Sequence, residues 1–166
     1  MTDEINLNLP ALDPAAVETK TGTTYPAPFR ENVEAREKKV LGDALGLTQF
    51  GVNLVRLAPG VMSSQRHSHT HEDEFVYGLE GELTLITDEG EQVLGPGMVA
   101  GFPAGTGNGH HLVNRGTATA VFLVVGSRDS RDEADYPDID LILRRRDGVA
   151  AFLQKDGTPY EEMKND

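Results

Sequence analysis

Five histidines form two tight clusters in this sequence, and imidazole is the side chain that most often binds transition metals in proteins. The first cluster is His67, His69 and His71, followed directly by an acidic run, and the second is His110 and His111. Alternate residues of a strand share a face, so His67 and His69 can direct their ring nitrogens toward one point. A carboxylate after a short turn and a histidine from another strand would complete a metal site.

The spacing of these residues resembles the two sequence motifs of the cupin superfamily. The first motif corresponds to Gly60, six residues, His67-Ser68-His69, four residues, Glu74, six residues and Gly81. The second corresponds to Gly97, five residues, Pro103-Ala104-Gly105, four residues, His110, three residues and Asn114. The gap of 15 residues between the motifs resembles that of single-domain, one-barrel members. Compared with the family pattern, a few extra residues precede His67 and His110, which should lengthen loops and leave the ligand pattern intact.

The resemblance implies a divalent metal ion bound by His67, His69, Glu74 and His110. The ion could be Zn, Fe, Mn or Ni, since histidine and carboxylate donors suit all of them. Glu74 is chosen over its acidic neighbours because it alone has the motif spacing to Gly81.

The two remaining histidines have other expected roles. We expect His71 to be a rim or solvent residue. We expect His111 to be packed near the site, because it would face the opposite side of a strand from His110.

A divalent metal ion bound by these residues would be compatible with several functions. The resemblance implies action on, or binding of, a small oxygen-bearing molecule such as a sugar or sugar phosphate, with an isomerase as one form of it. The alternatives are a non-catalytic small-ligand-binding or sensing module and a metal-dependent dioxygenase. A sugar phosphate would require a basic phosphate clamp. Arg56, Arg66 and Arg115 lie near the motifs, although a surface role is the simpler expectation for each.

Short apolar runs separated by turn residues predict the elements that carry these side chains. Spacing of about ten residues between them favours an all-β sandwich or barrel, and the family resemblance implies a small double-stranded β-helix, the jelly-roll or cupin barrel. The strands are expected at Val52–Leu57, Phe75–Leu79, Leu83–Thr87, Gln92–Leu94, Met98–Phe102, His110–Asn114, Ala118–Val125, Ile139–Leu143 and Val149–Leu153.

The flanking segments are expected to differ from the barrel. Residues 1–47 are predicted to form an N-terminal arm with a short helix capped by Asp13 and ended by Gly22, and Glu31–Val40 to be a surface turn or another short helix. Residues 48–166 would hold the barrel and a C-terminal hairpin, with Arg144–Gly148 as its solvated connection. The acidic stretch Asp129–Asp140 is predicted to be a solvated loop.

Composition narrows the range of partners. Lys and Arg number 15 and Asp and Glu 27, for a net charge of −12, which disfavours nucleic acid and anionic membrane surfaces. The absence of cysteine excludes disulfides and thiolate metal sites. The acidic start MTDEINLNLP does not predict a signal peptide, and a cytoplasmic location is expected. The family resemblance implies a homodimer that binds a small molecule.

Overall fold

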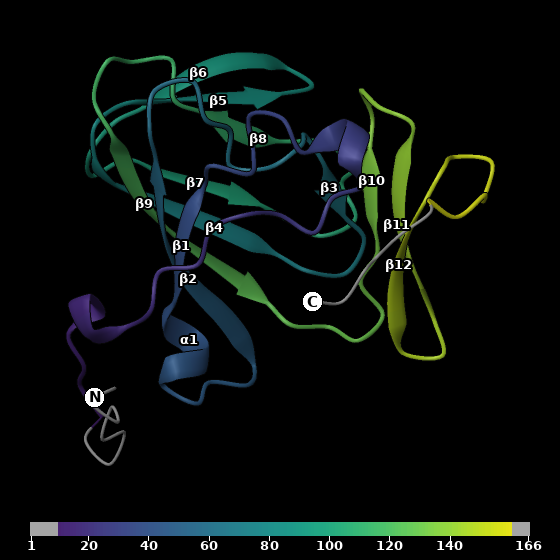
Figure 1. The fold of residues 1–166 in the computed structure, drawn as a ribbon, viewed down its shortest axis with the longest axis horizontal. Coiled ribbons are helices and arrows are strands. Elements are labelled where there is room, and N and C mark those ends of the chain that lie inside the picture. The colour runs from purple at the N-terminus through teal and green to yellow at the C-terminus, as the bar shows by residue number, and fades with distance from the viewer. Residues whose placement is uncertain (1–9, 161–166) are drawn as a thin grey trace.

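The structure is a computed structural model that describes residues 10–160. In that range the chain forms twelve short strands in three antiparallel sheets, with two 3₁₀ turns and one short helix (Figure 1). The predicted all-β barrel is therefore confirmed. The elements are η1 (Pro14–Ala16), η2 (Ala27–Phe29), β1 (Glu37–Val40), α1 (Leu41–Ala44), β2 (Phe50–Leu57), β3 (Ser68–His69), β4 (Glu74–Glu80), β5 (Leu83–Thr87), β6 (Gly90–Leu94), β7 (Val99–Phe102), β8 (His111–Val113), β9 (Ala120–Ser127), β10 (Ala134–Tyr136), β11 (Leu141–Arg146) and β12 (Val149–Leu153).

One wall of the barrel is the five-stranded sheet β1-β2-β9-β4-β7. Its register places Val55 opposite Phe122 and Val76 opposite Val124. Because side chains alternate between faces, these residues all point to the inner face. Val55, Val76 and Phe122 are buried there, so the apolar alternation of the sequence decides which face of the sheet forms the wall of the interior.

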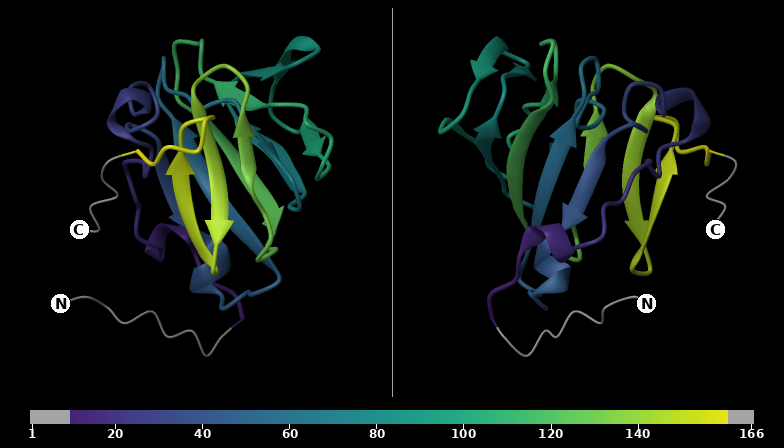
Figure 2. Two further views of the ribbon diagram at one scale, coloured as in Figure 1. Left: turned by 90° about the vertical axis from the view of Figure 1, so that its right-hand side faces the viewer. Right: turned by 60° about the vertical axis from the view of Figure 1, so that its left-hand side comes forward.

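Two smaller sheets stand opposite this wall. The sheet β6-β5-β8 closes the upper end in Figure 1, and the sheet β12-β11-β10-β3 closes the side. The left view of Figure 2 shows the strands β11 and β12 lying in front of the five-stranded sheet. Each small sheet has its own group of buried apolar residues, one centred on Leu85, Leu112 and Phe122 and the other on Tyr136 and Leu141. Neither group includes the buried polar side chains, among them His110, Asn114 and Asp132.

Asn114, the last residue of the second motif, joins the strands around this interior. Its side chain is fully buried, at 0% exposure. Its amide donates hydrogen bonds to the carbonyls of Leu57 (2.7 Å) and Ala118 (2.8 Å), and its oxygen accepts one from the amide of Gly116 (2.9 Å). The loop between β8 and β9 is thereby bound to the end of β2, so this motif residue serves the fold.

The strands expected between Val52 and Val125 are all present, with ends shifted by a few residues. The arm differs from expectation. Glu37–Val40 forms β1, paired with β2, instead of a turn or helix. The expected helix at Asp13 is only the turn η1, although Asp13 does cap it by accepting from the amide of Ala15 (2.8 Å). It ends early because the chain is already extended at Lys20, which pairs with Lys38.

The C-terminal hairpin forms with a tighter turn than expected. Its strand β11 continues through all three arginines, and the connection is only Asp147 and Gly148. Both turn residues have positive φ, 52° and 79°. An Asp-Gly pair tolerates these angles and matches the twist of the flanking strands, so no longer loop is needed.

Packing at Gly78 yields a test of the fold. Gly78 lies in β4, and a Cβ there would overlap the carbonyl oxygen of Gly95 in the neighbouring turn. Gly78→Ala should lower the free energy of unfolding by about 1–3 kcal/mol, because backbone must move. Gly101→Ala in the adjacent β7 would meet no atom within 4 Å, and should change it by less than about 0.5 kcal/mol. Urea unfolding measures both, and equal losses would contradict this packing.

Candidate metal centre

The two histidines of the first motif project to the same point, as their alternation predicts. His69 lies in the short strand β3, which pairs with β10, and His67 precedes it in a bridge to His110. The Nε2 atoms of His67 and His69 are 3.1 Å apart, and the two ring planes are nearly perpendicular. This arrangement aims both imidazoles into the interior.

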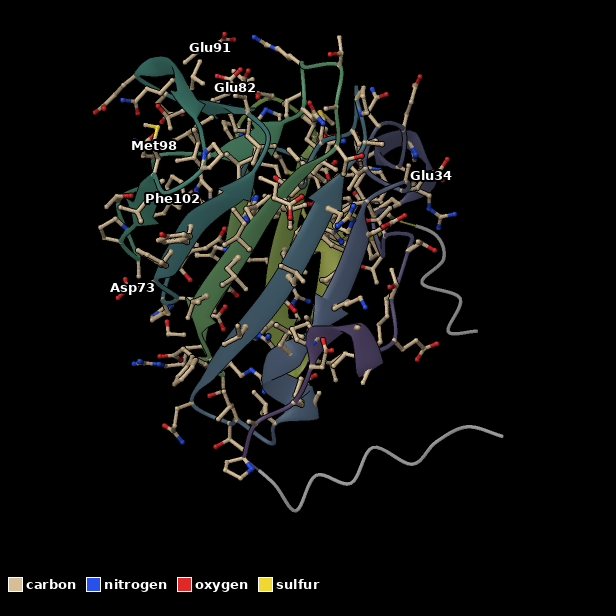
Figure 3. The ribbon with its side chains drawn as sticks, turned by 90° about the vertical axis from the view of Figure 1, so that its left-hand side faces the viewer. Glu34, Asp73, Glu82, Glu91, Met98 and Phe102 are labelled. Carbon is tan, nitrogen blue, oxygen red and sulfur yellow. The ribbon has the colours of Figure 1, made fainter. Side chains whose placement is uncertain are left out.

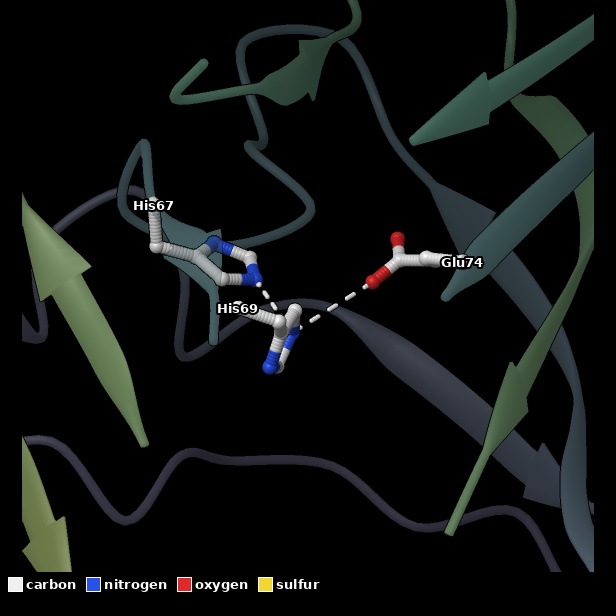
Figure 4. Close-up of side chains that lie close together, drawn as sticks. All are labelled: His67, His69 and Glu74. Carbon is white, nitrogen blue, oxygen red and sulfur yellow. Dashed lines mark hydrogen bonds and ion pairs between the residues drawn. The ribbon is translucent and has the colours of Figure 1, made fainter. Parts of the chain in front are cut away.

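Glu74 and His110 reach the same point from other strands. Glu74 is the first residue of β4, and its Oε2 is 3.6 Å from His69 Nε2 (Figure 4). Its Oε1 is 3.4 Å from Nε2 of His110, which lies just before β8. One donor atom each from His67, His69 and Glu74 falls within 4.8 Å of the others. The structure thus brings together all four residues that the motifs single out.

Hydrogen bonds on the far side of each ring orient the first two imidazoles. Nδ1 of His67 lies 2.8 Å from the carbonyl of Gln65, and Nδ1 of His69 lies 2.7 Å from Oδ2 of Asp132. Each Nδ1 must donate to its oxygen, so a neutral ring presents a lone pair at Nε2. Two such lone pairs and a carboxylate at short range form a donor set that fits a divalent cation.

His110 supports this conclusion independently. It is only 4% exposed, and among residues 10–160 neither of its ring nitrogens has a hydrogen-bond partner, although Nε2 lies 3.4 Å from Oε1 of Glu74. Its ring stacks on Phe102, with centroids 3.6 Å apart and planes 4° from parallel. A buried polar atom without a partner is costly. A cation near Nε2 would satisfy it, so the residues present fit a metal ion.

The electrostatics of the cluster lead to the same conclusion. Burial lowers the pKa of His67 to about 4. Burial acts in the same direction on His69, but its interactions with the carboxylates of Glu74 and Asp132 outweigh it and raise its pKa to about 9. Burial raises the pKa of Glu74, yet the surrounding histidines more than offset this and hold it well below its usual range. The two carboxylates thus favour positive charge at His69, the position where a cation would lie.

Asp132 is the functional residue that the sequence did not reveal. It falls in the acidic stretch predicted to be a solvated loop, but it is 4% exposed. One oxygen binds His69, and the other accepts from the amides of His71 and Glu72. The prediction was wrong for this residue because its partners are about sixty positions earlier in the chain. No spacing rule within the acidic stretch distinguishes it from its neighbours.

The other histidines and arginines lie outside the donor set. His71 is exposed, as expected, and His111 is half-buried with Nδ1 donating to the carbonyl of Ser64 (2.9 Å). The arginines considered for a phosphate clamp are paired with carboxylates. Arg56 is 3.8 Å from Glu37, Arg66 binds Asp138 and Asp88, and Arg115 binds Glu91.

The cluster opens into a cavity of about 230 Å³ between the five-stranded sheet and the arm. Its apolar wall includes Val55, Val76 and Phe122, and its polar lining includes Tyr25 and Arg36. A cavity of this size, with few polar groups at defined places, suits a small molecule. No helix among the described residues is long and apolar enough to span a membrane.

Known proteins are similar to this chain in sequence and fold. Residues 53–126 match the family model described as a cupin domain. The chain is similar to a crystal structure of a sugar phosphate isomerase of a cupin superfamily from Silicibacter pomeroyi, with 48% identity, a TM-score of 0.86, and coverage of 90% of this chain and 96% of that one. A candidate sugar phosphate isomerase from Acidithiobacillus ferrooxidans is 34% identical, with a TM-score of 0.72 and coverage of 83% and 84%.

More distant structures share the fold. A polyketide cyclase from Streptomyces resistomycificus is 22% identical, with a TM-score of 0.61 over 73% of this chain and 80% of that one. No curated protein matches the chain in sequence.

Asp132 can be tested as a positioning residue. In Asp132→Asn one of the two carboxylate oxygens becomes an amide NH₂, which cannot accept a hydrogen bond. Depending on the orientation of the amide, either Nδ1 of His69 or the backbone amides of His71 and Glu72 lose their acceptor. Metal affinity should fall about 10–100-fold, the usual effect of losing an outer partner of a histidine ligand. Asp135→Asn, an exposed position bound to Arg144, is the matched control. Titration with Zn²⁺ or Mn²⁺ measures both, and equal affinities would contradict the role of Asp132.

Proposed function

The chain is a single-domain member of the cupin superfamily, and from that premise we propose that it is a metal-dependent isomerase of a sugar phosphate. The observation that carries the proposal is the clustering of donor atoms from His67, His69 and Glu74 within 4.8 Å of one another, with Nε2 of His110 3.4 Å from Glu74, beside a cavity that His67, Glu74 and His110 line. The similarity to a sugar phosphate isomerase over nearly the whole chain supports the choice of reaction.

In this proposal the four residues hold a divalent cation, and the outer hydrogen bonds of His67 and His69 keep their Nε2 atoms free to bind it. When bound, such an ion polarises the carbonyl and hydroxyl oxygens of a sugar and so assists proton transfer between neighbouring carbons. Phe102 stacks on His110 and holds that ring in place. The buried side chains of Val76 and Phe122 exclude water from the wall beside the donors.

Binding of the cation gives a direct test. At a free metal concentration of 100 times Kd, wild-type protein should gain about 2.7 kcal/mol of stability, seen as a rise in Tm. His67→Ala and Glu74→Gln should lose this rise and the stoichiometric metal, because each removes a donor atom. His71→Ala, which removes an exposed histidine beside the cluster, should keep both. Unchanged metal content in the first two variants would refute the ligand assignment.

Turnover decides between the enzyme and the binding module. The metal-loaded protein is incubated with a panel of aldose and ketose phosphates, and products are identified by NMR. Interconversion that disappears in Glu74→Gln supports the isomerase. Ligand-induced stabilisation without conversion of any of the compounds would favour the non-catalytic sensing module instead.

We also propose that the protein is a homodimer through the outer face of the five-stranded sheet, onto which Figure 3 looks. On this face Phe75, Tyr77 and Val99 are 42%, 39% and 55% exposed, and Tyr77 stands opposite Leu123 and Val99 in the register. A continuous apolar face of this kind typically marks an association surface. A second copy of the chain offers the same face across a two-fold axis.

The dimer is tested by sedimentation equilibrium. Tyr77→Glu should convert a wild-type dimer to a monomer, because it places a charge within the buried contact. Val93→Glu on β6 is the control, since that residue is 57% exposed on a different sheet. A monomeric wild-type protein, or a dimer that resists Tyr77→Glu, would rule out this interface.

A further inference from the structure

Two basic side chains line the cavity from the edge of the five-stranded sheet that β1 forms. Arg36 directly precedes β1 and Lys38 lies within it, and both line the same cavity as His67 and Glu74. Their presence in one lining shows that the two side chains reach the same space, Lys38 from β1 and Arg36 from the residue before it. Lys38 stands opposite Val55 of β2, whose side chain is buried in the interior. The strand that carries these cations was expected to be a surface turn or helix.

Neither cation has a carboxylate partner within ion-pair distance among residues 10–160. Arg36 donates one Nη hydrogen bond to the carbonyl of Ser63, while its Nε is buried with no partner. The Lys38 ammonium makes no hydrogen bond in this part of the chain, and Asp43, the acid near it, is paired with Arg128. In the same range six arginines do pair with acids: Arg56, Arg66, Arg115, Arg128, Arg131 and Arg144.

Two partly buried cations side by side are unfavourable unless an anion binds between them. Burial lowers the pKa of Arg36 and of Lys38, and the charge of Arg36 lowers the pKa of Lys38 further. Two half-buried cations therefore repel each other and lack full hydration, in a chain whose net charge is −12. An oxyanion between them would remove the repulsion. Surface carboxylates are abundant, yet none of those described lies within ion-pair distance of these two.

The distance to the metal centre sets the shape of the ligand. In the sheet order, β2 and β9 separate β1 from β4, which carries Glu74. At about 4.8 Å per strand, the three steps from β1 to β4 cover about 14 Å across the sheet. The register aligns Lys38 with Gly78 of β4, and Glu74 lies four residues, about 13 Å, further along that strand, although the curvature of the barrel makes the direct path shorter. Tyr25 lies near both Arg36 and Glu74, between the two ends. A ligand that reaches both must carry its anion several bonds away from its metal-binding oxygens.

We propose that Arg36 and Lys38 form the phosphate-binding subsite of this cavity and select substrates that carry a phosphate monoester at the end remote from the metal. The assignment rests on the proposed function for the identity of the substrate, but the subsite itself exists without the metal. The planar guanidinium of Arg36 offers the paired donors that phosphate oxygens accept, and Lys38 adds a point charge.

The experiment measures binding of inorganic phosphate to full-length protein freed of metal with a chelator, by calorimetry and by the shift in Tm. Removing the metal ensures that phosphate bound to an ion is not counted. Arg36→Gln and Lys38→Gln should each weaken phosphate binding about tenfold or more, the loss typical of a hydrogen bond to a charged group. Lys38→Gln is the cleaner variant, because its side chain makes no hydrogen bond or ion pair in the described chain.

Matched controls make the same charge change on the other face of the sheet. Lys39→Gln alters the next residue of β1, whose ammonium binds the carbonyl of Pro14 (2.9 Å). Arg56→Gln alters an exposed arginine of β2. Both should bind phosphate within about twofold of wild type. If either control weakens binding as much as Lys38→Gln does, the effect is one of net charge and the subsite is refuted.

Two further arms separate this proposal from others. Acetate replaces phosphate in the first, and binding as tight as that of phosphate would overturn the phosphate assignment in favour of a carboxylate. Glu74→Gln is used in the second, where phosphate binding should persist although metal binding is lost. Metal binding with no phosphate binding by the metal-free wild type would refute the subsite and leave the metal centre standing. The reverse result would refute the metal centre and leave the subsite.

Discussion

The candidate site depends on a fold that holds mutually repelling lone pairs, on two imidazoles and one carboxylate, close to one another. Nε2 of His67 and Nε2 of His69 face each other at 3.1 Å, with the Glu74 carboxylate beside them. Nothing within the donor set favours this approach unless a proton or a cation lies between the atoms. It is maintained from outside, by the Gln65 carbonyl and Asp132 behind the rings and by the strands that carry them. The rigidity of the barrel is therefore what makes the donor set a binding site.

The charges of the chain are arranged around the same interior. Although the net charge is −12, several surface acids are bound by arginines, as Asp138 is by Arg66 and Glu91 by Arg115. The side chains that line the cavity include the acidic Glu74 and the basic Arg36 and Lys38. With a divalent ion bound beside Glu74, the ion and the two basic residues would all attract electron-rich groups. Among the described residues, Glu74 is the one acid in the cavity lining, so the net negative charge of the chain lies outside it.

The sequence was informative where a residue and its partner obey a short-range rule. His67, His69 and Glu74 lie within eight positions of one another. Alternation along a strand predicts that the two histidines share a direction, and the motif spacing to Gly81 selects Glu74. Asn114 was found from motif spacing alone. Arg36, Lys38 and Asp132 were missed because their surroundings come from strands distant in the chain. The run Glu37–Val40 has no apolar alternation, and it becomes a strand only because the edge of β2 offers it hydrogen bonds.

The residues that the sequence predicted and those that it missed lie in different parts of the chain. The predicted metal donors all fall within residues 53–126, the segment that matches the cupin family model. Arg36 and Lys38 precede that segment, and Asp132 follows it. The barrel segment therefore brings the candidate metal donors together, while Asp132, which follows it, orients His69, and Arg36 and Lys38, which precede it, line the same cavity as the donors. Similarity confined to the barrel would carry over the metal chemistry alone. The similarity to the sugar phosphate isomerase from Silicibacter pomeroyi covers 90% of this chain, well beyond the residues that match the cupin model.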